Sequence, residues 1–264
     1  MSDIALNDRG FTLGHGLFET VLWAGGVLEY WDDHVERMER GCRALGLPLP
    51  ARADLTAAAE AALAEAARAA AGRPARAAVR LNWSAGPGDR GLDPPGTYAP
   101  RLTASASAIA APTGPIRLAT ARTRRNDRSP ASRLKALSYL DNVLARAEAR
   151  AAGADEALML NTVGEIACAA AANVFWARHD EVFTPALDCG VLDGVLRRQV
   201  IAACHALGVP VQEVYANPGR VGGAPMFVTN SLMGVRPVAS LDGRDLPAST
   251  LVAAIAKAVS RAPK

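Results

Sequence analysis

The chain has 264 residues, of which 50% are hydrophobic and 21% are charged, and its formal net charge at pH 7 is +3. These values are typical of a globular protein of one or two domains with enough chain to bury a core. So small a charge excess, without a long run of Lys and Arg interleaved with aromatics, argues against a nucleic-acid-binding surface. The most basic stretch, residues 121–129, is equally well explained as a solvated loop with one or two anion contacts.

The cysteines and the N-terminal segment indicate the compartment. The cysteines are far apart and form no C-x-x-C pair, which argues against a zinc site and a disulfide framework; they are Cys42, Cys168, Cys189 and Cys204. The N-terminus lacks the basic and apolar regions of a secretory signal, and no segment reaches the roughly 18 consecutive apolar residues of a membrane span. We therefore expect a soluble, cytoplasmic protein without a metal or a membrane contact.

The first part of the chain is predicted to begin with a β-hairpin and two helices. Residues 16–31 contain two β-rich runs around a turn at residues 24–26. A helix should follow, with Asp32 or Asp33 as its N-cap, and the Ala-rich residues 51–71 predict a second helix.

A strand and a long loop complete this first part. Residues 75–83 predict the strand, and the Gly- and Pro-rich loop 84–96 is long enough to suggest a functional loop. Small residues with Pro and Gly then indicate a linker at residues 111–116. We therefore expect two α/β domains, a small one over residues 1–110 and a larger one over residues 117–264.

The second part is predicted to mix strands with helices. The expected strands lie near residues 116–122, 156–161, 164–176, 181–184, 211–215 and 226–231, and the expected helices cover residues 133–153, 194–207 and the C-terminus. The helix over residues 133–153 would bury an apolar stripe of Leu137, Leu140 and Leu144. Within the strand over residues 164–176, positions 169–172 carry only small side chains, as expected beneath a flat object.

Three segments carry residues suited to binding chemistry. Lys135 and Tyr139 would be neighbours at i and i+4 of a helix, where an amine in a partly apolar pocket can form a Schiff base. Taken alone, a lysine at a helix start is usually solvated. Gly194 and Val195 would begin a helix whose free N–H groups suit a phosphate, and the polar residues 229–231 end a strand. Each of these could also be a plain cap.

Taken together, six segments in order resemble the motifs of the class IV aminotransferase family, the fold type IV enzymes that use pyridoxal 5′-phosphate. The segments are LGHGLFET, HVERM, RLKALSYLDNVLA, GEIACAAAANVFW, TPALDCGVLDGVLR and TNSLMGVRPV. The resemblance implies the two-domain α/β (α+β) architecture of D-amino-acid aminotransferase, with the cofactor between the domains. It also implies a small-molecule substrate and a homodimer.

The resemblance also indicates an activity. NVFW, TNSLMGV and the spacing of RRN, SP and LK are most similar to the aminodeoxychorismate lyases, which split 4-amino-4-deoxychorismate into 4-aminobenzoate and pyruvate. D-amino-acid and branched-chain aminotransferases are close relatives. Amino transfer from an amino acid or amine to a 2-oxo acid is therefore the alternative activity.

The resemblance further implies roles for individual residues. Lys135 would bind the cofactor as a Schiff base and then act as general base and acid at the substrate α-carbon. The other implied cofactor-binding residues are Arg37, Val195, Leu196 and Ser231 around the 5′-phosphate, Tyr139 at the phenolic oxygen, Cys168 at the ring nitrogen, and Asn173. Arg90 would bind a substrate carboxylate, and Phe18 would line the substrate site.

Three positions depart from the family pattern. Cys168 replaces a glutamate that keeps the ring nitrogen protonated, and a neutral thiol is a weak donor without charge. Nearby Glu165 should point away from the site, because side chains alternate along a strand, unless a bulge intervenes. Leu196 replaces a threonine, and His15 replaces an aspartate and could simply pack or cap locally. These departures leave a further possibility, a member that binds the cofactor or another phosphate compound without efficient catalysis.

Overall fold

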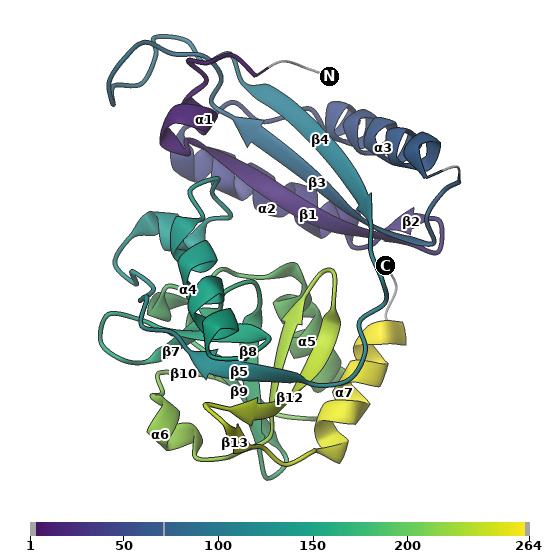
Figure 1. Ribbon diagram of the computed structural model, residues 1–264, viewed down its shortest axis with the longest axis vertical. Coiled ribbons are helices and arrows are strands. Elements are labelled where there is room, and N and C mark those ends of the chain that lie inside the picture. Colours follow the sequence, from purple (N-terminus) through teal and green to yellow (C-terminus); the bar gives the residue numbers. More distant parts are fainter. Residues whose placement is uncertain (1–3, 71, 262–264) are drawn as a thin grey trace. The chain divides into compact units, whose positions relative to one another are not determined.

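The computed structural model describes residues 4–70 and 72–261 and contains both helices and strands (Figure 1). The chain divides into two compact units. The first contains the described residues up to Ala111 together with Leu134–Ser138, and the second contains Pro112–Arg133 and the described residues from Tyr139 onward. The mixed α/β class expected from the sequence is confirmed.

The first unit is a four-stranded antiparallel sheet with helices on one face (Figure 1). The strands lie in the order β2-β1-β3-β4 and are β1 (Gly16–Ala24), β2 (Val27–Leu28), β3 (Arg76–Ser84) and β4 (Arg101–Ala108). The helices are α1 (Arg9–Leu13), α2 (Trp31–Leu45) and α3 (Arg52–Ala69). Leu17 and Trp23 of β1 share one buried core with Val35 of α2 and Leu63 of α3, so α2 and α3 cover the same face of the sheet.

The predicted hairpin and both helices of this unit are confirmed, but the predicted N-cap is wrong. The cap of α2 is Tyr30, in the left-handed region at φ 53°, and Asp32 and Asp33 lie in the first turn. Acidic side chains at that position interact favourably with the positive end of the helix dipole. Strand β4 was not expected, because its alternating Ser, Thr and Ala residues include few large apolar side chains.

The sequence suggested that a helix begins near residue 133, but residues 134–138 are not helical. The segment pairs with the edge of β1: Phe18 N–H donates to the Lys135 carbonyl at 2.8 Å, and Leu137 N–H donates to the Gly16 carbonyl at 2.9 Å. Helix α4 (Leu140–Ala151) begins after Tyr139, its N-cap residue. Lys135 and Tyr139 are therefore not helix neighbours, because the open edge of β1 offers backbone partners that the helix would otherwise supply.

The apolar stripe expected on this helix is also wrong. Leu140 and Leu144 are 66% and 47% exposed, whereas the buried residues of α4 are Asn142, Ala145 and Ala149. The small alanines allow α4 to pack closely on the sheet of the second unit, while the leucines face outward.

The second unit is built on a nine-stranded mixed sheet. Its strands are β5 (Ile116–Thr120), β6 (Glu156–Leu160), β7 (Ile166–Ala169), β8 (Asn173–Arg178), β9 (Glu181–Pro185), β10 (Val211–Val214), β11 (Met226–Asn230), β12 (Gly234–Leu241) and β13 (Arg244–Asp245). The main path has the order β10-β9-β8-β11-β12-β5-β6-β7. The helices after α4 are α5 (Val195–Ala206), α6 (Pro218–Val221) and α7 (Thr250–Arg261), and short 3-10 turns cover Pro130–Arg133 and Leu187–Cys189.

The segment over residues 164–176 forms two strands and not one. Strand β7 ends at Ala169, β8 begins at Asn173, and the Ala169 N–H donates to the Ala172 carbonyl across the bend at 2.8 Å. A β-bulge at Ala167 also interrupts the pairing of β7 with β6. The run of small residues thus forms a sharp bend between β7 and β8, where bulky side chains are absent.

Candidate active site

Lys135 lies on the sheet face of the first unit that α2 and α3 leave uncovered. The two backbone hydrogen bonds between its segment and β1 place Leu17 directly opposite Ala136. The side chains of this pair therefore point to the same side of the sheet. Leu17 belongs to the core under the helices, so Lys135, one residue before Ala136, points to the other side. There its half-buried amine lies over the Phe18 ring, with Nζ 4.2 Å from the ring centroid.

A buried cluster of charged groups surrounds Glu19 of β1. Glu19, 2% exposed, accepts from His34 Nδ1 at 2.7 Å and from Arg37 Nε and Nη2 at 2.8 and 2.6 Å. Burial alone would raise the pKa of Glu19, but the charge and hydrogen bonds of Arg37 and the hydrogen bond from His34 hold that pKa far below its usual range. Glu19 is therefore a carboxylate that fixes the guanidinium of Arg37.

His34 is neutral in this cluster. Burial lowers the pKa of His34, the Glu19 carboxylate opposes that shift, and the positive charges of Arg37 and Lys135 lower the pKa further. The neutral ring donates its Nδ1 proton to Glu19. Because the charge of Lys135 acts on His34, the amine and the Glu19 cluster belong to one electrostatic environment.

The second unit carries the other residues expected at the cofactor. Gly194 is the N-cap of α5, and no side chain caps this helix, whose first residues are Val195 and Leu196. A Cβ added at Gly194 would meet Asn173 Oδ1 at 2.0 Å, so only glycine allows the Asn173 amide to lie against this turn. Asn173 in turn donates to the Leu192 carbonyl at 2.8 Å.

A buried hydroxyl near this helix supports an anion site. Thr229 is directly opposite Asn173 in the pairing of β11 with β8 and is 1% exposed. Within the described part of the chain, its Oγ1 has no hydrogen-bond partner. A buried hydroxyl without a partner is destabilising unless a ligand satisfies it. Together with the uncapped N-terminus of α5, it fits a phosphate group.

Cys168 is buried in the core beneath α4. Burial raises the pKa of its thiol, the nearby Arg125 guanidinium lowers it, and Glu156 raises it further. Cys168 is therefore a neutral thiol at neutral pH. Arg125 is itself held by the Gly190 carbonyl at 3.0 Å and by Asn142 Oδ1 at 3.0 Å, and it also donates to the Ser132 carbonyl.

Glu165 is engaged elsewhere, although the bulge at Ala167 lies between it and Cys168. Its carboxylate accepts from Asn161 Nδ2 at 2.9 Å and from the Cys189 thiol at 3.7 Å. Glu165 thus serves the turn between β6 and β7.

His15 packs locally, one of the two possibilities that the sequence left open. Its Nδ1 accepts from Arg9 Nε at 3.3 Å, and its ring meets Tyr98 edge-on at 5.9 Å. Burial lowers the pKa of His15, and the charge of Arg9 lowers it further, so the ring stays neutral.

The remaining predicted site residues differ in burial. Arg90 is exposed in the loop between β3 and β4, where Arg9 donates to the carbonyls of Gly91 and Leu92. Ser231 directly follows β11 and is half-buried, as is Tyr139 at the start of α4.

Sequence reasoning missed several residues that complete these groups. Glu19 and His34 lie within the motifs FET and HVERM, so their pairing with Arg37 could have been sought there. Arg80 lies with its guanidinium carbon 3.8 Å from the Phe18 ring centroid, on the opposite side of the sheet from the helices. Its signal was the alternation of RAAVRLNWS, which places Arg80 and Asn82 on one face. Thr229 lies in the polar run 229–231 and Arg125 in the basic stretch 121–129, but the sequence did not distinguish either residue from its neighbours.

Several known proteins resemble this chain over most of its length. Residues 16–241 match the family model of the class IV amino-transferases. The aminodeoxychorismate lyase of Vibrio harveyi is 31% identical over 245 residues, covering 90% of this chain and 87% of the relative. The 4-amino-4-deoxychorismate lyase of Pseudomonas aeruginosa has a TM-score of 0.85 at 30% identity and covers 97% and 94% of the two chains. A branched-chain aminotransferase of Thermoproteus uzoniensis has a TM-score of 0.87 at 26% identity, covering 98% and 89%.

Two further findings bear on location. Of the helices within residues 4–70 and 72–261, none combines the length and apolarity needed to cross a bilayer. All four cysteines are buried free thiols.

Proposed function

Because the chain belongs to the class IV aminotransferase family of pyridoxal-phosphate enzymes, we propose that it is an aminodeoxychorismate lyase. Its substrate is then 4-amino-4-deoxychorismate, and its products are 4-aminobenzoate and pyruvate. One observation carries the proposal: the similarity to the Vibrio harveyi lyase spans 90% of the chain at 31% identity.

The resemblance assigns cofactor contacts to several residues of this chain. Lys135 would hold the cofactor covalently, and Arg37, oriented by Glu19, would bind phosphate. Ser231 and the first N–H groups of α5 would also bind phosphate. The buried Thr229 hydroxyl and the Asn173 side chain support that phosphate site. Tyr139 donates to the phenolic oxygen, and Cys168 lies at the ring nitrogen.

The chain's own residues move the proton. The bound cofactor withdraws electrons from the substrate carbon that bears the amino group. Once the substrate amine displaces it from the cofactor, the Lys135 amine would remove the hydrogen from that carbon, the C–O bond to the enolpyruvyl group would break, and the ring would become aromatic. Lys135 then returns the proton to the methylene carbon of the leaving group, which departs as pyruvate. Phe18 packs against the amine and limits the access of water, and Arg90 binds a substrate carboxylate.

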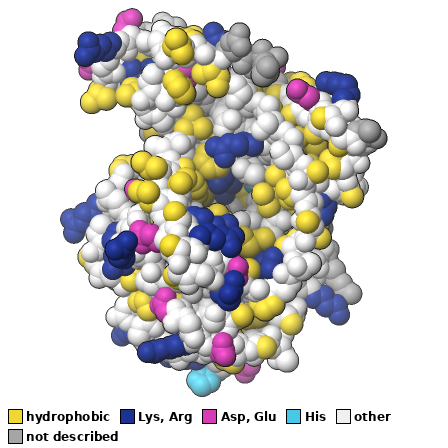
Figure 2. All heavy atoms as spheres, in the orientation of Figure 1, with side chains coloured by type: hydrophobic (Ala, Val, Ile, Leu, Met, Phe, Trp, Pro, Cys, Tyr) yellow, Lys and Arg dark blue, Asp and Glu magenta, His cyan; other side chains and the backbone are white. Residues whose placement is uncertain are grey.

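The proposal extends to a homodimer. Helix α4 presents Leu140, Val143 and Leu144 to solvent, and the N-terminal part of the first unit exposes Leu6 and Phe11. Apolar side chains also reach the surface at several places on the face shown in Figure 2. Clusters of exposed apolar side chains are typical of protein interfaces. Light scattering should therefore give twice the mass of one chain. The buried free thiols suit a reducing, cytoplasmic compartment.

Amino transfer is the second candidate, supported by the similarity to the Thermoproteus uzoniensis branched-chain aminotransferase. Both activities need the proton removed by Lys135 and differ in what happens next. The lyase expels an aromatic product, whereas the aminotransferase passes the amino group to a 2-oxo acid.

The test supplies the cofactor-loaded protein with 4-amino-4-deoxychorismate and, separately, with amino acids plus a 2-oxo acid. Formation of 4-aminobenzoate and pyruvate in equal amounts supports the lyase, and Lys135→Ala should abolish it. Oxo-acid-dependent amine transfer without 4-aminobenzoate would favour the aminotransferase. If neither product forms, the alternative of a cofactor-binding member without efficient catalysis gains support.

A further inference from the structure

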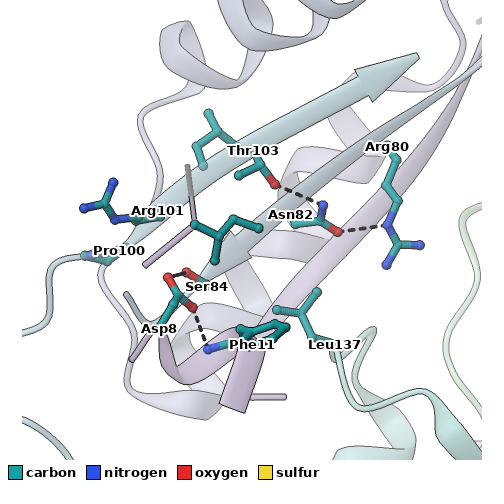
Figure 3. Close-up of a pocket in the computed structure, with 12 residues that line it drawn as sticks. Asp8, Phe11, Arg80, Asn82, Ser84, Pro100, Arg101, Thr103 and Leu137 are labelled. Carbon is teal, nitrogen blue, oxygen red and sulfur yellow. Dashed lines mark hydrogen bonds between the residues drawn. The ribbon is translucent and has the colours of Figure 1, made fainter. Parts of the chain in front are cut away.

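The first unit contains a cavity on the uncovered face of its sheet (Figure 3). Its volume is about 490 Å³, and it lies entirely within this unit. The apolar part of its lining includes Ile4, Phe11 and Leu137, and the polar part includes Arg80, Asn82 and Thr103. Mostly apolar walls with a few converging polar groups are typical of sites for small organic ligands, as is a volume within about 300–1,000 Å³.

Lys135 lies on the same face of the sheet as the cavity. Leu137 lines it, and Lys135 points to the same side because the two residues alternate with Ala136 along the paired segment. Asn82, in the polar lining, is directly opposite Phe18 in the pairing of β3 with β1. A ligand in this cavity therefore lies beside the Phe18 ring that carries the Lys135 amine.

Arg80 and Lys135 approach the same aromatic ring. The Arg80 guanidinium carbon is 3.8 Å and Lys135 Nζ is 4.2 Å from the Phe18 centroid, which places the two cationic groups within about 8 Å of each other. A single small substrate can reach both. Cation–π stacking on one ring holds each group against the sheet.

Hydrogen bonds further orient Arg80. Its Nε donates to Asn82 Oδ1 at 2.9 Å, and Asn82 Nδ2 donates to Thr103 Oγ1 at 3.1 Å, so three strands contribute to one chain of contacts (Figure 3). Arg80 lies beside Asn82 in Figure 3, whereas the exposed Arg101 points away from Asn82. A pre-oriented guanidinium presents its N–H groups in the planar geometry that a carboxylate matches.

We infer that Arg80 binds the ring carboxylate of the substrate, with the ring seated in the cavity and the amino group directed to Lys135. The inference rests on the proposed function, whose substrate and aromatic product both carry a carboxylate across the ring from the amine. Arg80 is then the residue that selects a carboxylated ring, whereas the enolpyruvyl carboxylate remains available to Arg90.

The test compares two probes that differ in one charge, 4-aminobenzoate and 4-aminobenzamide. Binding of each is measured by calorimetry to the cofactor-loaded wild type and to Arg80→Met, Arg80→Lys and Arg68→Gln. Arg68 is exposed on α3 and serves as the matched control. Urea unfolding of each variant checks that the fold is retained.

Arg80→Met should weaken 4-aminobenzoate binding at least about tenfold, as expected for the loss of a charge-assisted pair, and change amide binding less than about twofold. Arg80→Lys should recover part of the loss, and Arg68→Gln should behave as the wild type. With 4-amino-4-deoxychorismate, Arg80→Met should raise KM more than it lowers kcat.

Three results would overturn the inference. They are unchanged acid binding in Arg80→Met, an equal loss of acid and amide, or a wild type that does not distinguish the two probes. Failure of the proposed function looks different, because the wild type would then bind the acid selectively yet release no 4-aminobenzoate from the substrate.

Discussion

Replacing Glu19 by glutamine tests whether the buried cluster holds Arg37 in place. Glu19 accepts one hydrogen bond from His34 and two from Arg37, and it is almost fully buried. Glutamine has the same shape but no charge, and its amide nitrogen would face a donor of Arg37 or His34. The variant therefore leaves the Arg37 charge without its counter-ion.

The magnitude follows from this arrangement. Breaking a buried ion pair by removing one partner costs about 3–5 kcal/mol, and glutamine preserves some of the hydrogen bonds, so we expect a loss of about 3 kcal/mol in the free energy of unfolding. Glu36→Gln is the matched control, because Glu36 lies on α2 next to Arg37 and forms an exposed pair with Arg40 at 3.8 Å. That change should cost less than about 0.5 kcal/mol.

Urea unfolding of both variants without cofactor measures the difference, and a cofactor titration should show weaker binding in Glu19→Gln because Arg37 is no longer oriented.

The pKa of Glu19 is lower in the folded than in the unfolded chain, so its stabilisation is complete above the unfolded pKa of about 4.3 and is lost as pH falls below it. The gap between wild type and variant should thus be constant near neutral pH and shrink in acid. A loss below about 1 kcal/mol, or a gap that widens in acid, would refute this reasoning.

Three further substitutions test the residues of the second unit. Gly194→Ala brings a methyl group 2.0 Å from Asn173 Oδ1, so it should lower stability by about 1–3 kcal/mol and weaken cofactor binding; unaltered thermal unfolding and cofactor titration would contradict this. Thr229→Val removes the unpartnered hydroxyl, so it should leave the cofactor-free protein as stable or raise its melting temperature while lowering cofactor affinity; equal affinity would argue against a phosphate contact. Cys168→Glu should raise kcat for 4-aminobenzoate formation, because a carboxylate keeps the ring nitrogen protonated; a fall in kcat would show that the thiol is adapted to the reaction.

Local sequence signals predicted the hairpin, both long helices and strand β3 of the first unit. The two β-rich runs about Gly25 and Gly26 predicted the hairpin, and Gly46, at φ 65°, ends α2 where the chain needs a left-handed residue. These features depend on neighbours in the sequence, so they can be recognised without knowledge of the tertiary structure.

The errors concern residues whose conformation depends on distant partners. Leu134–Ser138 has helix-forming residues but pairs with β1, more than one hundred positions earlier in the chain. Likewise, the apolar periodicity of Leu140 and Leu144 does not reveal that the small alanines face the sheet. The second strand of GEIACAAAANVFW was missed because alanine fits a strand and a tight bend equally well.

The candidate site was predictable in its motifs but not in the partners of its residues. The resemblance singled out Lys135 and Arg37 as candidates, whereas Glu19, His34 and Arg80 stand out only through their contacts across strands and helices. A glutamate or an arginine in a strand is usually solvated. Only the register of β1 with β3 places Arg80 beside Phe18.

The most direct test of the account is the absorption spectrum of the protein titrated with pyridoxal phosphate. Lys135, Lys257 and Lys264 are the only lysines in the sequence, so Lys257→Ala, an exposed residue of α7, is a matched control for Lys135→Ala. The account predicts a saturable visible band in the wild type and in Lys257→Ala that is absent in Lys135→Ala, and borohydride reduction should fix the cofactor to the peptide containing Lys135. No band in the wild type, or the same band in Lys135→Ala, would contradict the assignment of Lys135 as the residue that holds the cofactor.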